Sequence, residues 1–103
     1  MEKTRLTLQT ALEEFLGSRY VYYQPPESIQ LHYPCILYEL DRIDPIYADN
    51  GSYLKNKQYS VTIVHQDADS TLPDDILDAF ELIRFDRTYR ADNLYHDVFT
   101  ITW

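Results

Sequence analysis

Three histidines and one cysteine are the side chains of this 103-residue chain that most often bind metals or attack substrates. His32, His65 and His96 do not have the spacing of a metal site, and no cysteine pair lies beside them. His96 directly precedes Asp97, so a local histidine–carboxylate pair can form there, although such pairs are common in purely structural settings. His65 continues the alternation of a strand, which predicts a histidine on one face of a sheet.

The remaining chemistry-bearing residues also favour a structural role. Asp67 and Asp69 look like the start of a calcium loop, but the further ligands, the glycine and the terminal carboxylate are missing. Gly17 and Gly51, the two glycines, cannot make a phosphate-binding loop. Cys35 has no second cysteine for a disulfide, and its apolar neighbours predict a buried thiol. We therefore expect no enzyme, with no catalytic residue, no metal site and no cofactor.

The net negative charge of the chain disfavours some classes of binding partner. Nine lysines and arginines against seventeen aspartates and glutamates give a formal net charge of −8. Affinity for nucleic acids and anionic membranes depends mainly on cationic side chains, so both are disfavoured, although DNA that passes nearby without being held is compatible with this balance. The absence of a run of about 18 apolar residues and of a signal peptide predicts a protein kept in a reducing cytosol. Ten tyrosines are typical either of an interaction module or of a sheet lined with tyrosines, and both interpretations stay open.

The elements that must position these residues begin with a helix. Apolar residues at helical spacing predict it over Thr4–Leu16, and a glycine follows. Tyrosines and a valine predict a short strand over Arg19–Tyr23, which Pro25 and Pro26 end. A strand over Cys35–Asp41 is apolar on both faces and is therefore predicted to be central and covered on both sides.

Turn residues separate this strand from the next. Turns are predicted at Asp44-Pro45 and at Asp49–Ser52, because Asp, Asn, Gly and Pro favour turn conformations. The second turn either closes a hairpin or tips a projecting loop. Strict alternation then predicts a strand over Lys55–Gln66.

A second helix is predicted over Leu72–Arg84. Ser70 or Thr71 can cap its start, and its buried stripe extends to Ile83. Asp and Ser residues before it break the preceding strand.

The stretch Phe85–Trp103 is predicted to be the closing hairpin of the sheet. Asp92 and Asn93 mark its bend, because both residue types tolerate a left-handed backbone. Phe99 and Ile101 alternate with smaller residues and predict a half-buried strand.

The predicted order of elements is therefore helix, strand, strand, strand, helix, strand, strand. Residues 1–103 are predicted to form a single α+β domain. Its sheet should be mostly antiparallel, with about four to five strands and two helices packed on it.

Arg84, Arg87 and Arg90 are conspicuous in an acidic chain. Along a regular strand, residues three apart alternate sides, so the arginines are not expected to share one face. They either pair locally with carboxylates such as Asp86 and Asp92 or dock on an acidic patch of a neighbouring subunit. We favour the intersubunit role, because copies of an acidic domain need such complementarity to offset their repulsion.

Several segments together resemble a family of small neck proteins from long-tailed bacteriophages. They are Val21–Glu27, Tyr33–Glu39, Tyr59–Thr62, Arg84–Arg87 and Ala91–Phe99. The family is variously called tail terminator, tail completion or minor capsid protein, mostly from phages and prophages of Gram-positive bacteria. The resemblance runs over most of the chain, and the motifs that carry it are structural.

The resemblance implies an α+β domain that assembles with itself as a ring, usually a hexamer, at the head-proximal end of the tail tube. Such a ring ends tube polymerisation and offers a joining surface to the head, so the implied partners are the tail-tube protein and a head-connector or neck protein. DNA would only pass through the lumen, and no membrane is involved. The implied location is the tail or neck of the virion, and the host cytoplasm during assembly.

Contacts within such a ring are expected from the Gln24–Ser28 loop, the Asp44–Tyr53 loop and the Arg84–Asp97 segment. The side chains expected to make them are Pro25, Pro26, Tyr47, Tyr53, Arg84, Arg87, Arg90, Asp92 and Asn93. Arg87 and Arg90 are the expected intersubunit contacts, and Tyr47 and Tyr53 are the expected loop anchors. The family motif supports Arg87 better than the others.

Other functions stay open at the level of sequence. The nearest is a head-completion or connector protein of the same neck. A small hydrolase or isomerase that uses Asp side chains and His96 would need a pocket with convergent polar groups. A cytosolic regulator that binds a host protein would be a monomer or a simple dimer and would form no ring.

Overall fold

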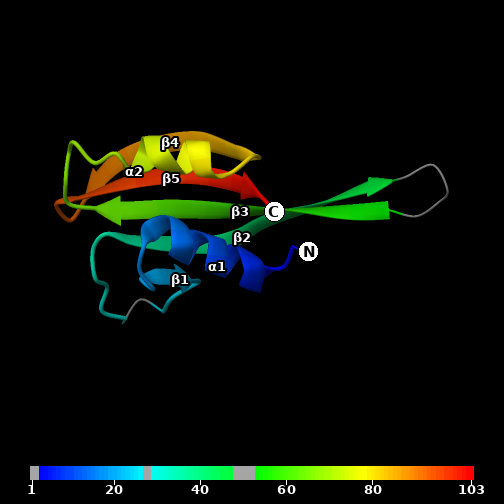
Figure 1. Cartoon of the computed structure of the whole chain (residues 1–103), viewed down its shortest axis with the longest axis horizontal. Coiled ribbons are helices and arrows are strands. Elements are labelled where there is room, and N and C mark those ends of the chain that lie inside the picture. The colour runs from blue at the N-terminus through cyan, green and yellow to red at the C-terminus, as the bar shows by residue number, and fades with distance from the viewer. Residues whose placement is uncertain (1–2, 27–28, 48–52) are drawn as a thin grey trace.

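The computed structural model describes residues 3–26, 29–47 and 53–103, without the side chains of residues 44–47 and 53–55. Two helices and five strands follow one another in the predicted order (Figure 1). They are α1 (Arg5–Leu16), β1 (Val21–Tyr23), β2 (Cys35–Tyr47), β3 (Tyr53–His65), α2 (Leu72–Ala79), β4 (Ile83–Ala91) and β5 (Leu94–Thr102). The predicted α+β class is confirmed.

The five strands form one sheet in the order β1-β2-β3-β5-β4. β1 runs parallel to β2, and the other neighbouring pairs are antiparallel. Leu8 and Leu12 of α1 and Ile76 of α2 join a single buried cluster with residues of the sheet. Both helices therefore pack on the same face, which we call the helical face; the opposite face is called the open face (Figure 1).

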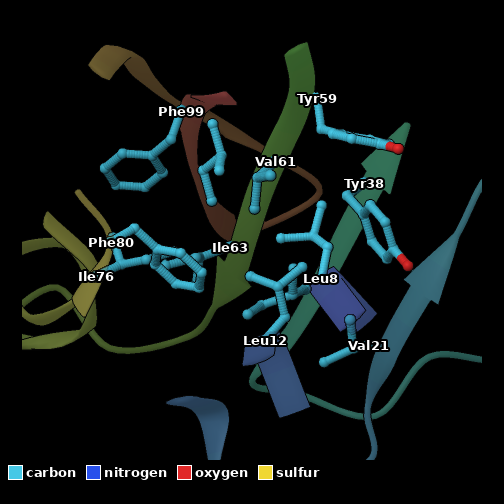
Figure 2. Packing of buried hydrophobic residues seen from close by; sticks show 12 residues of the cluster. Leu8, Leu12, Val21, Tyr38, Tyr59, Val61, Ile63, Ile76, Phe80 and Phe99 are labelled. Atoms are coloured by element: carbon cyan, nitrogen blue, oxygen red, sulfur yellow. The ribbon is translucent and has the colours of Figure 1, made fainter. Parts of the chain in front are cut away.

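The core lies between the helices and the three central strands (Figure 2). Alternate residues of each strand face it, as the period of two along a strand requires. The buried strand residues on this side are Ile36, Tyr38, Tyr59, Val61, Ile63, Phe99 and Ile101. The alternation predicted for β3 and β5 is thus confirmed, and removal of this apolar surface from water is the main stabilising contribution.

α1 begins and ends at the signals that the sequence contains. The Thr7 N–H donates to the Thr4 hydroxyl (3.3 Å), and the Thr4 N–H donates to the Thr7 hydroxyl (2.8 Å), which satisfies amides that the first helical turn leaves free. Gly17 follows the helix in the left-handed conformation (φ 78°), and its N–H donates to the Glu13 carbonyl. The predicted first helix is confirmed, with Thr4 as its cap.

α2 is shorter than predicted. It ends at Ala79, and Phe80 already has an extended backbone (φ −124°, ψ 140°). Ile83, predicted on the buried stripe of the helix, instead begins β4 and pairs with β5. An isoleucine at this position fits either pattern, and backbone pairing with β5 replaces the last predicted turns. At the helix start, Thr71 is the N-cap residue but makes no side-chain cap hydrogen bond. The Ser70 hydroxyl just before it accepts a hydrogen bond from the Leu72 N–H (3.2 Å).

β2 is longer than predicted. The turn predicted at Asp44-Pro45 is wrong, because both residues continue β2 and pair with β3. Beyond Tyr38, β2 has no β1 partner, and an open strand edge tolerates proline. The turn predicted at Asp49–Ser52 lies outside the described residues.

The prediction that β2 is covered on both sides holds only at its start. Cys35 is fully buried, whereas Leu37 on the open face is half-buried, because both helices pack on the helical face. β2 is central in the sense that it lies between β1 and β3. The register shifts between Leu40 and Arg42, so Asp41 forms a bulge.

The closing hairpin is confirmed, although its first strand begins two residues earlier than predicted. Asp92 and Asn93 join β4 to β5 with φ values of 53° and 63°. Left-handed conformations at both central residues make the two-residue turn whose twist matches that of the flanking strands. After β5, the Trp103 indole N–H donates to the Thr4 carbonyl (3.0 Å), which ties this end of the sheet to the start of α1.

Candidate interaction surfaces

A bulge in β4 changes which arginines share a face. Phe85 and Arg87 lie opposite consecutive residues of β5, so Asp86 is an extra residue in the strand. This extra residue brings Arg87 to the open face, the same side as Arg84, while Arg90 falls on the helical face. The prediction that consecutive arginines alternate sides is therefore wrong for Arg84 and Arg87.

Asp86 fixes this bulge through two short hydrogen bonds. The Thr100 hydroxyl donates to Oδ2 (2.6 Å), and Nε of Arg84 donates to Oδ1 (2.9 Å). Burial alone would raise the pKa of Asp86, but the Thr100 hydroxyl and the Arg84 guanidinium outweigh it and hold the pKa below its ordinary value. Arg84 is thus partly engaged by its own chain, as the local-pairing interpretation expected.

Arg87 and Arg90 have aromatic neighbours. The Arg87 guanidinium lies 5.5 Å from the ring centre of Tyr89, and that of Arg90 lies 4.9 Å from Tyr95. Tyr89 stacks on His96 with ring centres 4.7 Å apart. Within the part of the chain that the structure describes, neither arginine forms an ion pair, although the charge of Arg87 contributes to lowering the pKa of Asp86.

The carboxylate of Asp97 is buried and contacts His65 rather than its neighbour His96. Nε2 of His65 lies 2.6 Å from Oδ2, and the Thr88 hydroxyl donates to Oδ1 (2.7 Å). His96 instead lies on the open face beside Tyr89. The local pair considered for His96 and Asp97 is therefore not formed.

This cluster does not have the order of a nucleophilic site. The carboxylate lies between the Thr88 hydroxyl and the His65 ring, whereas a general base must contact the hydroxyl itself. A hollow of about 280 Å³ lies beside His65, with Tyr33 and Ser70 in its walls. Nδ1 of His65 is buried without a hydrogen-bond partner among the described residues. The hydrogen bonds of Asp97 to His65 and Thr88 therefore link β5 to β3 and to β4.

A groove of about 490 Å³ lies between the two helices above the end of β5. Ala11 and Phe15 of α1 line it, as do Ala79 and Phe80 at the end of α2, and Trp103. No local pattern in the sequence signals this groove. Its width depends on how far apart two helices lie on the sheet, which neither helix encodes alone.

The outer parts of β2 and β3 form a two-stranded arm, residues 43–47 and 53–57, that projects beyond the sheet (Figure 1). β5 pairs with β3 only from Gln58 onward, so among the described residues no third strand pairs with the arm. The arm accounts for the elongated dimensions of 51 × 27 × 23 Å. Tyr47 and Tyr53, predicted as loop anchors, lie opposite each other in the register of the arm, and their side chains are outside the description.

The other predicted contact residues are dispersed. Pro25 lines a hollow of about 300 Å³ on the open face next to Leu37, whereas Pro26 is exposed. Asp92 and Asn93 form the tip of the β4–β5 hairpin, at the opposite end of the sheet from the arm (Figure 1). The predicted residues therefore do not make one site but occupy the open face, the helical face (Arg90), the arm and the hairpin tip.

No cluster of three His, Cys, Asp or Glu side chains among the described residues is placed to hold a metal ion. Neither of the described helices is long and apolar enough to cross a membrane. Comparison of the chain with protein-family models, curated proteins and solved structures gives no match. The surfaces themselves and the resemblance of the sequence segments are thus the basis for a functional proposal.

Proposed function

We propose that this protein is a structural neck protein of a long-tailed bacteriophage. It assembles as a homo-oligomeric ring at the head-proximal end of the tail tube, ends tube polymerisation and forms the surface that joins the head. The observation that carries the proposal is the two-stranded arm, which extends from the sheet with no third strand beside it in the described part of the chain. The resemblance of the sequence segments to tail terminator proteins supports the biological setting.

The arm needs a partner for physical reasons. A two-stranded hairpin on its own is marginally stable in water. The Lys57 carbonyl at the base of the arm accepts a hydrogen bond from the Trp103 N–H (2.9 Å). Beyond it, neither β1 nor β5 reaches the arm, so its described edges present unpaired backbone N–H and C=O groups. At its base, Ile43 exposes 46% of its surface. These features fit a segment that is completed by a neighbouring subunit, either by strand addition or by packing on an apolar surface.

A ring follows if the contact between copies is head-to-tail and the rotation closes. Such a ring ends polymerisation by occupying the surface to which the next tube subunit would bind. The charge of −8 per copy favours a negative lumen, which repels DNA phosphates and allows the DNA to slide. A basic lumen in the assembled ring would contradict this part of the proposal.

Analytical ultracentrifugation over a range of concentrations, with and without tail-tube protein, tests the proposal. We expect a closed ring, or a ring that forms only on tube ends, and tubes that are shorter in electron micrographs when the protein is present. A protein that stays monomeric and does not bind the tube would overturn the proposal. A ring that binds the head connector and ignores the tube would indicate the connector role instead.

Removal of the arm provides a sharper version of this test. Residues 43–57 are replaced by Asn-Gly, so that Arg42 and Gln58 are joined by a two-residue turn. Because every residue of the buried cluster lies outside the arm, the variant should fold, as circular dichroism would verify. Loss of the ring in a folded variant is the expected result, and a ring of unchanged stability would show that the arm is not required.

A further inference from the structure

We propose that neighbouring subunits join through the open face of β4 on one copy and the outer face of α2 on the next. The contact is between opposite charges and runs head to tail. The inference rests on the proposed self-assembly and specifies which two surfaces meet.

The first surface is a basic patch formed by Arg84, Arg87 and Tyr89. The bulge at Asp86 places all three on the open face. They are exposed, and Arg87 lies against the Tyr89 ring without an ion pair among the described residues. The aromatic ring orders the guanidinium before a partner arrives, which reduces the entropy lost on binding. Arginine with tyrosine is also the composition that protein interfaces favour.

The second surface is an acidic patch formed by Asp74, Leu77 and Asp78 of α2. Residues 67–81 contain six acidic residues and no lysine or arginine. Asp74 and Asp78 are four residues apart on the side of the helix opposite the buried Ile76, and two like charges at this spacing destabilise a helix. Leu77 beside them exposes 38% of its surface. The acidic patch therefore combines negative charge with apolar surface, which is complementary to a partner surface that combines positive charge with apolar area.

Asp78 has no evident structural reason to be acidic. Asp75, by contrast, accepts a hydrogen bond from the Thr71 hydroxyl (3.0 Å) and lies in the first turn, where the helix dipole stabilises an anion. Asp78 lies at the other end of α2, where the dipole disfavours a negative charge. Over the described part of the chain, its carboxylate forms no ion pair. A cation from another copy would offset both the dipole and the repulsion from Asp74.

The two patches cannot neutralise each other within one subunit. α2 packs on the helical face, and the basic patch lies on the open face, so the two point to opposite sides of the sheet. Both belong to the same edge of the sheet, since α2 packs against β4 (Figure 1). A contact between them is therefore heterologous, leaving one patch of each kind free for the next copy until a ring closes.

Charge reversal tests the contact. Arg87→Glu and Asp78→Lys should each raise the dissociation constant of self-assembly at least about tenfold, because an attraction becomes a repulsion. The double variant R87E/D78K should return to within about threefold of the natural protein, because the coupled pair is restored with its sign exchanged. An equimolar mixture of the two single variants should also assemble, since every contact in an alternating assembly then pairs opposite charges.

Two controls change the net charge by the same amount at other places. Arg19→Glu lies at an exposed position between α1 and β1, and Glu14→Lys lies on α1. Both should assemble much like the natural protein in ultracentrifugation, and circular dichroism verifies that all variants fold. Raising the salt concentration from 0.1 M to about 1 M, which shortens the Debye length from about 10 Å to about 3 Å, should weaken the natural assembly more than that of either single variant.

The outcomes separate the two proposals. If the natural protein assembles but Arg87→Glu and Asp78→Lys have no effect, or the double variant does not recover, the charge contact is wrong and the ring proposal stands. If the natural protein never assembles, at any concentration or on tail tubes, both proposals are wrong.

Discussion

His65 of β3 and Asp97 of β5 lie in contact in the interior, with Nε2 2.6 Å from Oδ2, although 32 residues separate them in the chain. The second oxygen of Asp97 accepts a hydrogen bond from Thr88 of β4, and one side chain therefore links three strands. Asp97→Ala should lower the free energy of unfolding by about 3 kcal/mol, because removing one member of a buried pair leaves the other without compensation. Urea titration followed by circular dichroism measures this change.

Two further variants serve as controls for the stability loss measured in Asp97→Ala. Asp97→Asn keeps an oxygen that can accept from His65, so it should lose clearly less stability than the alanine variant. Asp69→Ala changes an exposed carboxylate and should alter the free energy of unfolding by less than about 0.5 kcal/mol. An Asp97→Ala loss no larger than that of Asp69→Ala would mean that the link between the strands contributes nothing.

Asp86 should make stability depend on pH in the acid range. Its pKa is lowered in the folded protein, so its contribution is complete above the pKa of the unfolded chain, which is about 3.9, and disappears as the pH falls through the folded value. In Asp86→Asn this contribution is absent at every pH. The difference in unfolding free energy between the natural protein and this variant should therefore shrink between about pH 6 and about pH 2. A difference that stays constant over this range would show that the Thr100 and Arg84 contacts do not stabilise the charged form.

Local residue types were sufficient for much of the fold. The Asp92-Asn93 bend follows from the tolerance of both residue types for positive φ, and the start of α1 follows from a threonine whose hydroxyl caps it. The alternation of Phe99 and Ile101 identifies β5, which lies between β3 and β4 in the sheet. In each case a short-range preference and the long-range packing favour the same conformation.

The errors arise where local patterns are ambiguous. Ile83 continues a helical stripe and also begins a strand, and only the presence of β5 decides between them. The bulge at Asp86 involves no glycine or proline, so nothing in the sequence shows that Arg84 and Arg87 reach the same face. The contact between His65 and Asp97, like the groove between the helices, depends on tertiary arrangement and has no signature at short spacing.

Cys35 should be nearly unreactive in the folded protein. Burial raises the pKa of its thiol to about 11 from 9.0, so at about pH 8 only about 0.1% is thiolate, against about 10% in an unfolded chain. Labelling with an aromatic disulfide reagent should therefore be at least about 100-fold slower in buffer than in concentrated urea. Because the chain has a single cysteine, the absorbance change reports this thiol alone. Equal labelling rates in the two solvents would contradict the burial of Cys35.

The same thiol should weaken the fold at high pH. A folded pKa above the unfolded value means that the stabilising contribution is present below about pH 9 and is lost as the pH rises toward about 11. Cys35→Ala removes this titration, so its stability should fall less over that interval. Tyr38 and Tyr59, whose pKa values burial also raises, add to the loss in both proteins and cancel in the comparison.

Trp103 should stabilise the fold through its indole N–H as well as its ring. The N–H donates to the Thr4 carbonyl and to the Thr7 hydroxyl, both at 3.0 Å, and the ring packs edge-on against Phe80 with centres 6.0 Å apart. Trp103→Phe keeps an aromatic ring but loses the donor, so the free energy of unfolding should fall by about 1–2 kcal/mol from the lost hydrogen bonds and the smaller ring. Urea titration measured by far-ultraviolet circular dichroism suits both proteins, because the variant lacks the sole tryptophan.

A double-mutant cycle that combines Trp103→Phe with Thr7→Val separates the contribution of the indole N–H through Thr7 from that of ring packing. Thr7→Val removes one acceptor of the indole N–H and also the partner of the Thr4 amide, so it destabilises α1 by itself. If Trp103 and Thr7 interact directly, the double variant should be more stable than the sum of the two losses predicts, by at least about 0.5 kcal/mol. Strict additivity would mean that the indole N–H does not contribute through Thr7, and that Trp103 stabilises the junction between β5 and α1 by packing and by its bond to the Thr4 carbonyl alone.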